Sequence, residues 1–165
     1  MGAARIVKHL LTPHWVALRA FPRAALRRIE AAIRDSEKSH CGELRFAVEA
    51  GLHPAQLLRG LGPRHRAREV FAQLEVWNTE HNSGVLIYVQ LVDRRIEILA
   101  DRGVSARVGQ QEWDAICRRM ETAFRAGHFE AGALEGIREI TALLAAHFPP
   151  AGAKPNELPD RPVVL

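Results

Sequence analysis

Residues 84–92 read GVLIYVQLV, and this segment determines how the rest of the chain can be arranged. An almost unbroken run of β-branched and apolar residues predicts a strand that is buried on both faces, at the centre of a sheet. Asp93 and Arg94 then form a turn, and residues 95–100 return as a second apolar strand. A turn this short predicts an antiparallel hairpin.

Upstream, residues 42–49 alternate between apolar and mostly charged positions, with Leu44, Phe46 and Val48 on one side. A period of two predicts a strand with one wet or partly wet face, near an edge of the sheet. An apolar stripe at helical spacing over 63–77 predicts a helix between this strand and the central one. A helical crossover permits the two strands to run parallel, so that both begin at the same rim of the sheet.

Further stripes at helical spacing predict a domain of alternating helices and strands, and therefore the α/β class. The predicted helices span 22–34, 54–61, 63–77, 110–126 and 130–147. The resulting organisation is a basic N-terminal arm at 1–21, an α/β domain at 22–148, and a flexible C-terminal tail at 149–165 that is rich in proline, glycine and polar residues.

Composition limits the class of protein. The chain has 165 residues, of which 47% are hydrophobic and 25% charged, as expected for one globular domain. No apolar run is long enough to span a bilayer, and charged residues interrupt the N-terminus where a secretory signal would be apolar. The two cysteines, Cys41 and Cys117, do not predict a disulfide framework. We therefore expect a cytoplasmic protein.

The charge of the chain is concentrated at its beginning. The formal net charge is +4, and up to Ile29 there are six lysines and arginines and no acidic residue. Such an arm can bind anionic lipid or nucleic acid, or it can simply be a solvated surface. Few aromatic residues are interleaved with these charges, which disfavours nucleic acid. Peripheral attachment to a membrane is the alternative that stays open.

Three polar loops should meet at the rim where the two parallel strands begin. We call them the first loop (39–41), the second loop (78–83) and the third loop (101–103). Together they carry the chemically suggestive side chains His40, Cys41, Glu80, His81, Asn82, Asp101 and Arg102. Such a set could bind an oxygen-coordinated cation or a small anion. The alternative is ordinary loop chemistry, in which asparagine and aspartate form turns and Asp101 caps the following segment.

If the rim is an active site, the residue types assign its roles. Arg102 or Arg107 would hold a phosphate, while Asp101 or Glu80 would act as acid, base or ligand. His81 would transfer a proton. Glu80, Asn82 and Asp101 are the candidate metal ligands. The sequence contains no glycine-rich phosphate loop, no Gly-x-Ser-x-Gly elbow and no His-Glu-x-x-His motif that would name the reaction.

The order of several motifs resembles one family. A helix ends near Trp77 in a polar turn, and the apolar strand, the Asp93-Arg94 turn and the returning strand follow. Downstream, Phe124-Arg125-Ala126-Gly127-His128-Phe129 leads into a final helix. This order resembles the TPM domain over residues 22–148. The resemblance implies a three-layer α/β/α sandwich with a mixed, mainly parallel sheet that contains a β-hairpin.

The resemblance also implies a choice of functions. Some TPM domains bind calcium or a similar divalent ion, one plant branch is described as an acid phosphatase, and others look like assembly modules. Where many members have Asp-Asn-Gly before the central strand, this chain has Asn82-Ser83-Gly84, and Arg107 stands where an acid is expected. Fewer carboxylates weaken the attraction for Ca2+ or Mg2+.

These departures favour one reading over two others. We expect a non-enzymatic binding or assembly module for a protein partner or a membrane-associated complex. A divalent-metal-assisted, phosphatase-like hydrolase is the first alternative. Binding of anionic lipid or nucleic acid through residues 1–28 is the second.

Overall fold

The computed structural model describes residues 3–150 and 155–165 of the chain. Its centre is a sheet with the strand order β3-β2-β1-β4. The strands are β1 (Glu43–Glu49), β2 (Gly84–Gln90), β3 (Arg95–Ala100) and β4 (Val163–Val164). Every residue of β2 is buried, as the apolar run at 84–92 predicts.

The pairing of the strands confirms the predicted topology. β1 runs parallel to β2, with Glu43 opposite Gly84. β2 and β3 form the antiparallel hairpin, which places Val85 opposite Ala100. Both parallel strands therefore begin at the rim where β3 ends.

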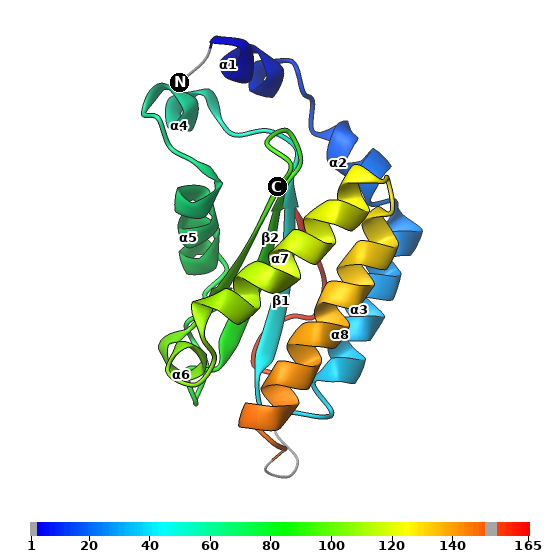
Figure 1. Cartoon of the computed structure of the whole chain (residues 1–165), viewed down its shortest axis with the longest axis vertical. Helices are drawn as coiled ribbons and strands as arrows, with labels where there is room; N and C mark the ends of the chain where they lie inside the picture. The colour runs from blue at the N-terminus through cyan, green and yellow to red at the C-terminus, as the bar shows by residue number, and fades with distance from the viewer. Residues whose placement is uncertain (1–2, 151–154) are drawn as a thin grey trace.

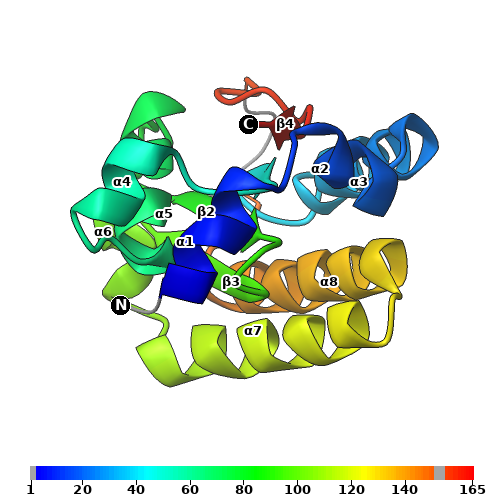
Figure 2. The ribbon, with the colours of Figure 1, turned by 90° about the horizontal axis from the view of Figure 1, so that it is seen from above.

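Helices cover both faces of this sheet, which confirms the three-layer α/β/α arrangement (Figures 1 and 2). Three long helices lie on one face, and α5 lies on the other. The helices are α1 (Ala3–Leu10), α2 (Trp15–Ala20), α3 (Arg23–Ser36), α4 (Pro54–Leu58), α5 (Pro63–Gln73), α6 (Arg102–Ser105), α7 (Gln110–Arg125) and α8 (Phe129–His147). The helix predicted to reach Trp77 is shorter than expected. It ends at Gln73, and Trp77 is exposed.

The main core lies between the sheet and helices α3, α7 and α8. Phe21, which precedes α3, is fully buried, and its ring meets those of Phe46, Phe124 and Phe129 edge-on at centroid distances of 5.5, 5.7 and 5.8 Å. Such edge-to-face contacts add to the free energy of apolar burial. This aromatic cluster ties the start of α3 to β1 and to the turn between α7 and α8.

The prediction that β1 lies near an edge of the sheet is confirmed, since only the two-residue strand β4 lies outside it, but the prediction of a wet or partly wet face is wrong. All seven of its residues are buried, and it lies between β2 and β4. The alternation misleads because the charged residues of β1 are buried with partners from distant segments. Arg45 donates to the carbonyl of Pro159, the amide of Leu158 donates to Glu43 Oε2 at 3.1 Å, and Arg66 pairs with Glu49 at 3.0 Å.

The predicted flexible tail also differs from the structure. Residues 155–165 lie along β1, and the amide of Leu165 donates to the carbonyl of Val48 at 2.9 Å. Leu158 packs into the smaller core beside α5. Residues 151–154 of the predicted tail, and residues 1–2 of the predicted arm, lie outside the described residues. The apolar pattern of 155–165 is too short to predict a strand without its partner β1.

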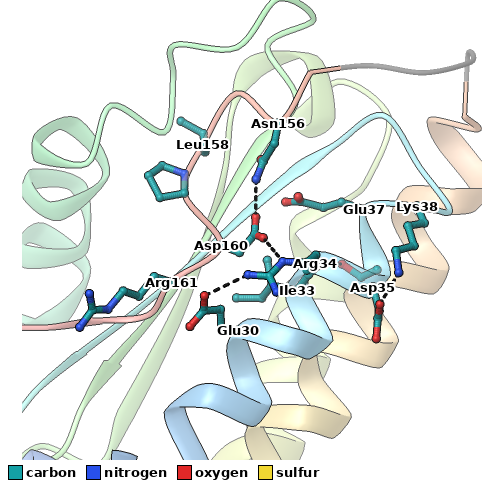
Figure 3. A network of polar contacts seen from close by, with 12 residues as sticks. Glu30, Ile33, Arg34, Asp35, Glu37, Lys38, Asn156, Leu158, Asp160 and Arg161 are labelled. Atoms are coloured by element: carbon teal, nitrogen blue, oxygen red, sulfur yellow. Dashed lines mark hydrogen bonds and ion pairs between the residues drawn. The ribbon is translucent and has the colours of Figure 1, made fainter.

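A polar network fastens this C-terminal segment to α3 (Figure 3). Asp160 is buried and accepts a hydrogen bond from Arg34 Nε at 3.0 Å and one from Asn156 Nδ2 at 2.7 Å. Arg34 also donates to Glu30 at 3.0 Å on its own helix. Asp160 is therefore the polar residue through which the tail is held on the helix.

We predict that Asp160→Ala lowers the free energy of unfolding by about 2 kcal/mol, because it removes charge-assisted hydrogen bonds to a buried carboxylate. It should also increase hydrogen exchange at the Leu165 amide. The matched control is Asp35→Ala, which removes an exposed ion pair with Lys38 in the same region and should change stability by less than about 0.5 kcal/mol. Equal effects of the two variants in chemical denaturation would contradict this account.

Candidate functional site

The three predicted loops meet at one rim of the sheet, as the topology requires. Ser83 of the second loop donates its hydroxyl to the carbonyl of Cys41 in the first loop, at 3.2 Å. The amide of Gly103 in the third loop donates to the carbonyl of Asn82 at 3.1 Å. The second loop therefore lies between the other two and contacts both.

Asp101 follows the end of β3 and begins the third loop. Its Oδ1 accepts a hydrogen bond from the amide of Arg102 at 2.7 Å, so it caps the short helix α6. This confirms the capping role that the sequence left open. The second oxygen, Oδ2, is buried and has no hydrogen-bond partner among the described residues.

Asn82 and Arg102 bind each other across the rim. Arg102 Nε donates to Asn82 Oδ1 at 2.8 Å. Asn82 has a φ of 51°, in the left-handed region that asparagine tolerates better than most residues. Asn82 Oδ1, which the sequence analysis named as a candidate metal ligand, therefore accepts a hydrogen bond from the guanidinium of Arg102 instead.

A pocket of about 330 Å³ opens at this rim. Its lining residues are Cys41, His81, Gly103, Arg107, Phe148 and Pro149. The Arg107 side chain is held in place, since Nη1 donates to the carbonyl of His147 at 2.6 Å and the guanidinium lies 4.5 Å from the centre of the Phe148 ring. No carboxylate is among the described residues that line the pocket.

Of the other predicted site residues, His81 lines the pocket, and His40 and Glu80 are not among its lining residues. His81 is exposed and lines it, whereas His40 is buried with Nδ1 3.1 Å from the carbonyl of Gly42. Glu80 is exposed, and its amide donates to Glu157 Oε2 at 2.7 Å. That Glu80, Asn82 and Asp101 share an ion stays a prediction.

The donor set around the rim does not fit a divalent cation well. Within residues 3–150 and 155–165, no group of three or more histidine, cysteine, aspartate or glutamate side chains is placed to hold a metal ion. The unpartnered Oδ2 of Asp101 would suit a cation, but Arg102 brings a positive charge to the neighbouring Asn82. Hard divalent ions need several oxygen ligands and gain affinity with each carboxylate.

The two cysteines differ in their surroundings. The Cys41 thiol donates to the carbonyl of Pro149 at 3.1 Å, at the edge of the pocket. Burial raises the pKa of the Cys117 thiol to about 12. Cys117 is therefore a packed apolar group rather than a reactive thiol at neutral pH, as its neighbours on α7 predict.

Sequence reasoning missed a buried polar cluster on the α5 side of the sheet. The Tyr88 hydroxyl donates to Glu49, and Arg66 Nε donates to the same carboxylate at 3.0 Å. Burial raises the pKa of Tyr88 above its ordinary value. One signal was available, since a tyrosine within an apolar strand usually needs a partner for its hydroxyl. Phe148 and Pro149 of the rim pocket were missed because they follow the last helix and carry no polar signal.

Comparison with known proteins gives the same family that the motifs suggest. The model of the TPM domain matches residues 19–143. The BA42 protein of the psychrophilic bacterium Bizionia argentinensis, solved by NMR, is 31% identical with a TM-score of 0.74, covering 85% of this chain and 92% of that one. The N-terminal domain of a P. gingivalis protein is 18% identical with a TM-score of 0.63, covering 83% and 90%. No curated protein matches the chain.

The structure also bears on the expectation that no segment spans a bilayer. None of the helices in the described ranges has the length and apolar character needed to cross a bilayer.

We predict that Gly103→Ala disrupts the rim. An added Cβ would lie 2.6 Å from the carbonyl oxygen of His81 and 2.7 Å from that of Asn82, and main-chain atoms cannot move aside cheaply. The cost should be about 2 to 3 kcal/mol of unfolding free energy. Gly109→Ala is the control, because its Cβ would meet nothing closer than 3.7 Å, and it should cost less than about 1 kcal/mol in chemical denaturation. A Gly103→Ala variant as stable as the wild type would contradict the close contact of the two loops.

Proposed function

This chain belongs to the TPM-domain family, and we propose that it is a non-enzymatic binding module whose rim pocket takes an acidic group of a protein partner. The observation that carries the proposal is the charge of the pocket. Its lining includes Arg107 and His81 and, among the described residues, no carboxylate. A pocket so lined attracts an anionic group and repels a cation.

Arg107 is suited to hold such a group. Its contacts with the carbonyl of His147 and the Phe148 ring orient the guanidinium before a ligand arrives. Nη2 and Nε make no hydrogen bond to any residue that the structure describes, so they are available as donors. A guanidinium matches the two oxygens of a carboxylate or phosphate, and a group already held in place loses less entropy on binding.

Arg102, which precedes Gly103 in the chain, also favours binding of an acidic group. It is exposed, and only its Nε is used, in the hydrogen bond to Asn82. Its two terminal amino groups have no partner in the described part of the chain. The partner's acidic surface can therefore meet a second guanidinium near the pocket.

A phosphohydrolase is the second candidate, and one observation favours it. The buried Oδ2 of Asp101 has no partner among the described residues, and a buried carboxylate oxygen without a hydrogen bond can serve as a ligand or a catalytic group. The donor set around it favours an anion over a divalent ion, for the reasons given above. We therefore rank hydrolysis below binding.

We predict weak binding of inorganic phosphate, with a Kd in the millimolar range expected for one small anion at an exposed site. In an NMR titration the amide signals of His81, Gly103 and Arg107 should shift. Arg107→Ala should weaken the binding by about tenfold, because it removes the oriented guanidinium. Arg118→Ala is the control, because Arg118 is an exposed arginine of α7 that does not line the pocket, and it should leave binding unchanged.

The same protein should not turn over p-nitrophenyl phosphate at acidic or neutral pH, with or without added Ca2+ or Mg2+. Robust turnover that Asp101→Ala abolishes would overturn the proposal in favour of the hydrolase. If phosphate shifts none of the amide signals of the rim in the NMR titration, the proposed anion site is wrong as well.

A further inference from the structure

Most of the large apolar side chains that the described chain exposes lie on its first two helices. These side chains belong to Val7, Leu10 and Leu11 at α1 and to Trp15 and Leu18 of α2. The remaining exposed large apolar side chains, Leu58 and Trp77, lie elsewhere in the described chain. Leu11 is 76% exposed and Trp15 is 57% exposed. We call these five residues, which belong to α1, to Leu11 directly after it and to α2, the N-terminal apolar face.

Helix α1 is attached to the domain by its polar side. Arg5 donates to both oxygens of Asp93, at 2.8 and 2.7 Å. His9, one turn later, is buried with Nε2 3.2 Å from Asp93, and its Nδ1 accepts a hydrogen bond from the amide of Leu52 at 2.9 Å. A surface helix normally buries its apolar side and exposes its polar side. In α1 the arrangement is reversed.

The anchor of α1 is stable at neutral pH. Burial alone would raise the pKa of Asp93, but the hydrogen bonds from Arg5 and His9 hold it below its ordinary value. A lowered pKa means that the carboxylate contributes stability above its ordinary pKa and loses it only in acid. The hydrogen bonds to Asp93 therefore help to hold α1 in this orientation at neutral pH.

The segment that carries the apolar face contains basic residues and no acidic residue. The first acidic residue of the chain is Glu30, and six basic residues precede it. Arg5 and Arg28 are paired with Asp93 and Glu130. Lys8 and Arg19, which lie on α1 and α2, form no ion pair with any residue that the structure describes. The face thus combines apolar side chains with uncompensated positive charge.

This face lies at the end of the sheet opposite the rim pocket. Arg5 and His9 bind Asp93, which follows the end of β2, and Leu52, which follows the end of β1. The rim pocket lies where these strands begin. In Figure 1, α1 and α4 are at the top of the molecule and α6 is at the bottom. Figure 2 shows α1 beside α4 when the molecule is seen from above.

We propose that the N-terminal apolar face docks on the surface of an anionic lipid bilayer. Amphipathic helices with leucine, tryptophan and lysine or arginine bind such surfaces by placing their apolar side chains at the headgroup boundary. Lys8 and Arg19 contact the negatively charged headgroups. A bilayer fits better than a second copy of the chain, because two copies would bring like charges together. Docking here leaves the rim pocket facing away from the membrane, open to a partner.

The test is co-sedimentation of the full chain with vesicles. We expect binding to vesicles of phosphatidylcholine with about 30% phosphatidylserine, weaker binding to pure phosphatidylcholine, and loss of binding as salt is raised to about 0.5 M. Replacing both leucines (Leu10→Glu with Leu11→Glu) should reduce binding by about 20-fold or more. Replacing both cations (Lys8→Glu with Arg19→Glu) should reduce it by a similar factor, since each charge near the surface contributes about fivefold.

The control is Trp77→Ser, which removes an exposed apolar side chain at the rim end and should not change vesicle binding. The substituted side chains are exposed, so the melting temperatures of the variants should match that of the wild type and show that the variants fold. Arg107→Ala should also bind vesicles normally, which separates this inference from the proposed function of the pocket.

Three results would overturn the inference. One is no difference between anionic and neutral vesicles. Another is unchanged binding by the leucine variant. The third is a dimer in analytical ultracentrifugation that the leucine variant dissociates while vesicles bind neither form, because the face would then be an interface between two copies.

Discussion

The parallel pairing of β1 with β2 is the constraint on which the rest of the structure depends. Its register places Glu43 opposite Gly84, so the residues before each strand lie side by side. Gly84 permits this arrangement, because an added Cβ would lie 1.9 Å from the carbonyl oxygen of Val76. Parallel strands require a crossover, and α4 and α5 supply it on the face that the longer helices leave free. The hairpin then returns the chain to the same rim.

This topology places different side chains at the two ends of the sheet. Loops at the starts of β1 and β2 meet the end of β3 and the segment after α8, and together they form the pocket with Arg107 and His81. The turns beyond the other ends of β1 and β2 receive α1 through Asp93 and Leu52. In our account the first end takes an acidic group of a partner and the second end meets a lipid surface. The sheet between them keeps the two surfaces apart.

Local sequence patterns predict much of this fold, and long-range pairings explain what they miss. The apolar run at 84–92 and the short turn at Asp93 predict the central strand and hairpin, and the crossover predicts which loops meet. The alternation of 42–49 suggests a strand with a wet face, because nothing in the sequence says that Leu158 and Arg66 will pair with its charges. The reversed orientation of α1 is hidden for the same reason, since Arg5 and His9 find Asp93 more than eighty residues away.

The measurement that tests this account most directly is the set of nuclear Overhauser contacts between β1 and β2 in the labelled protein. Parallel pairing gives cross-strand contacts that join Glu43 to Gly84 and Val48 to Val89, together with contacts between Asn82 and Gly103. Contacts that joined Glu43 to the far end of β2, near Gln90, would mean antiparallel strands. The first and second loops would then lie at opposite ends of the sheet, and the rim pocket would not exist.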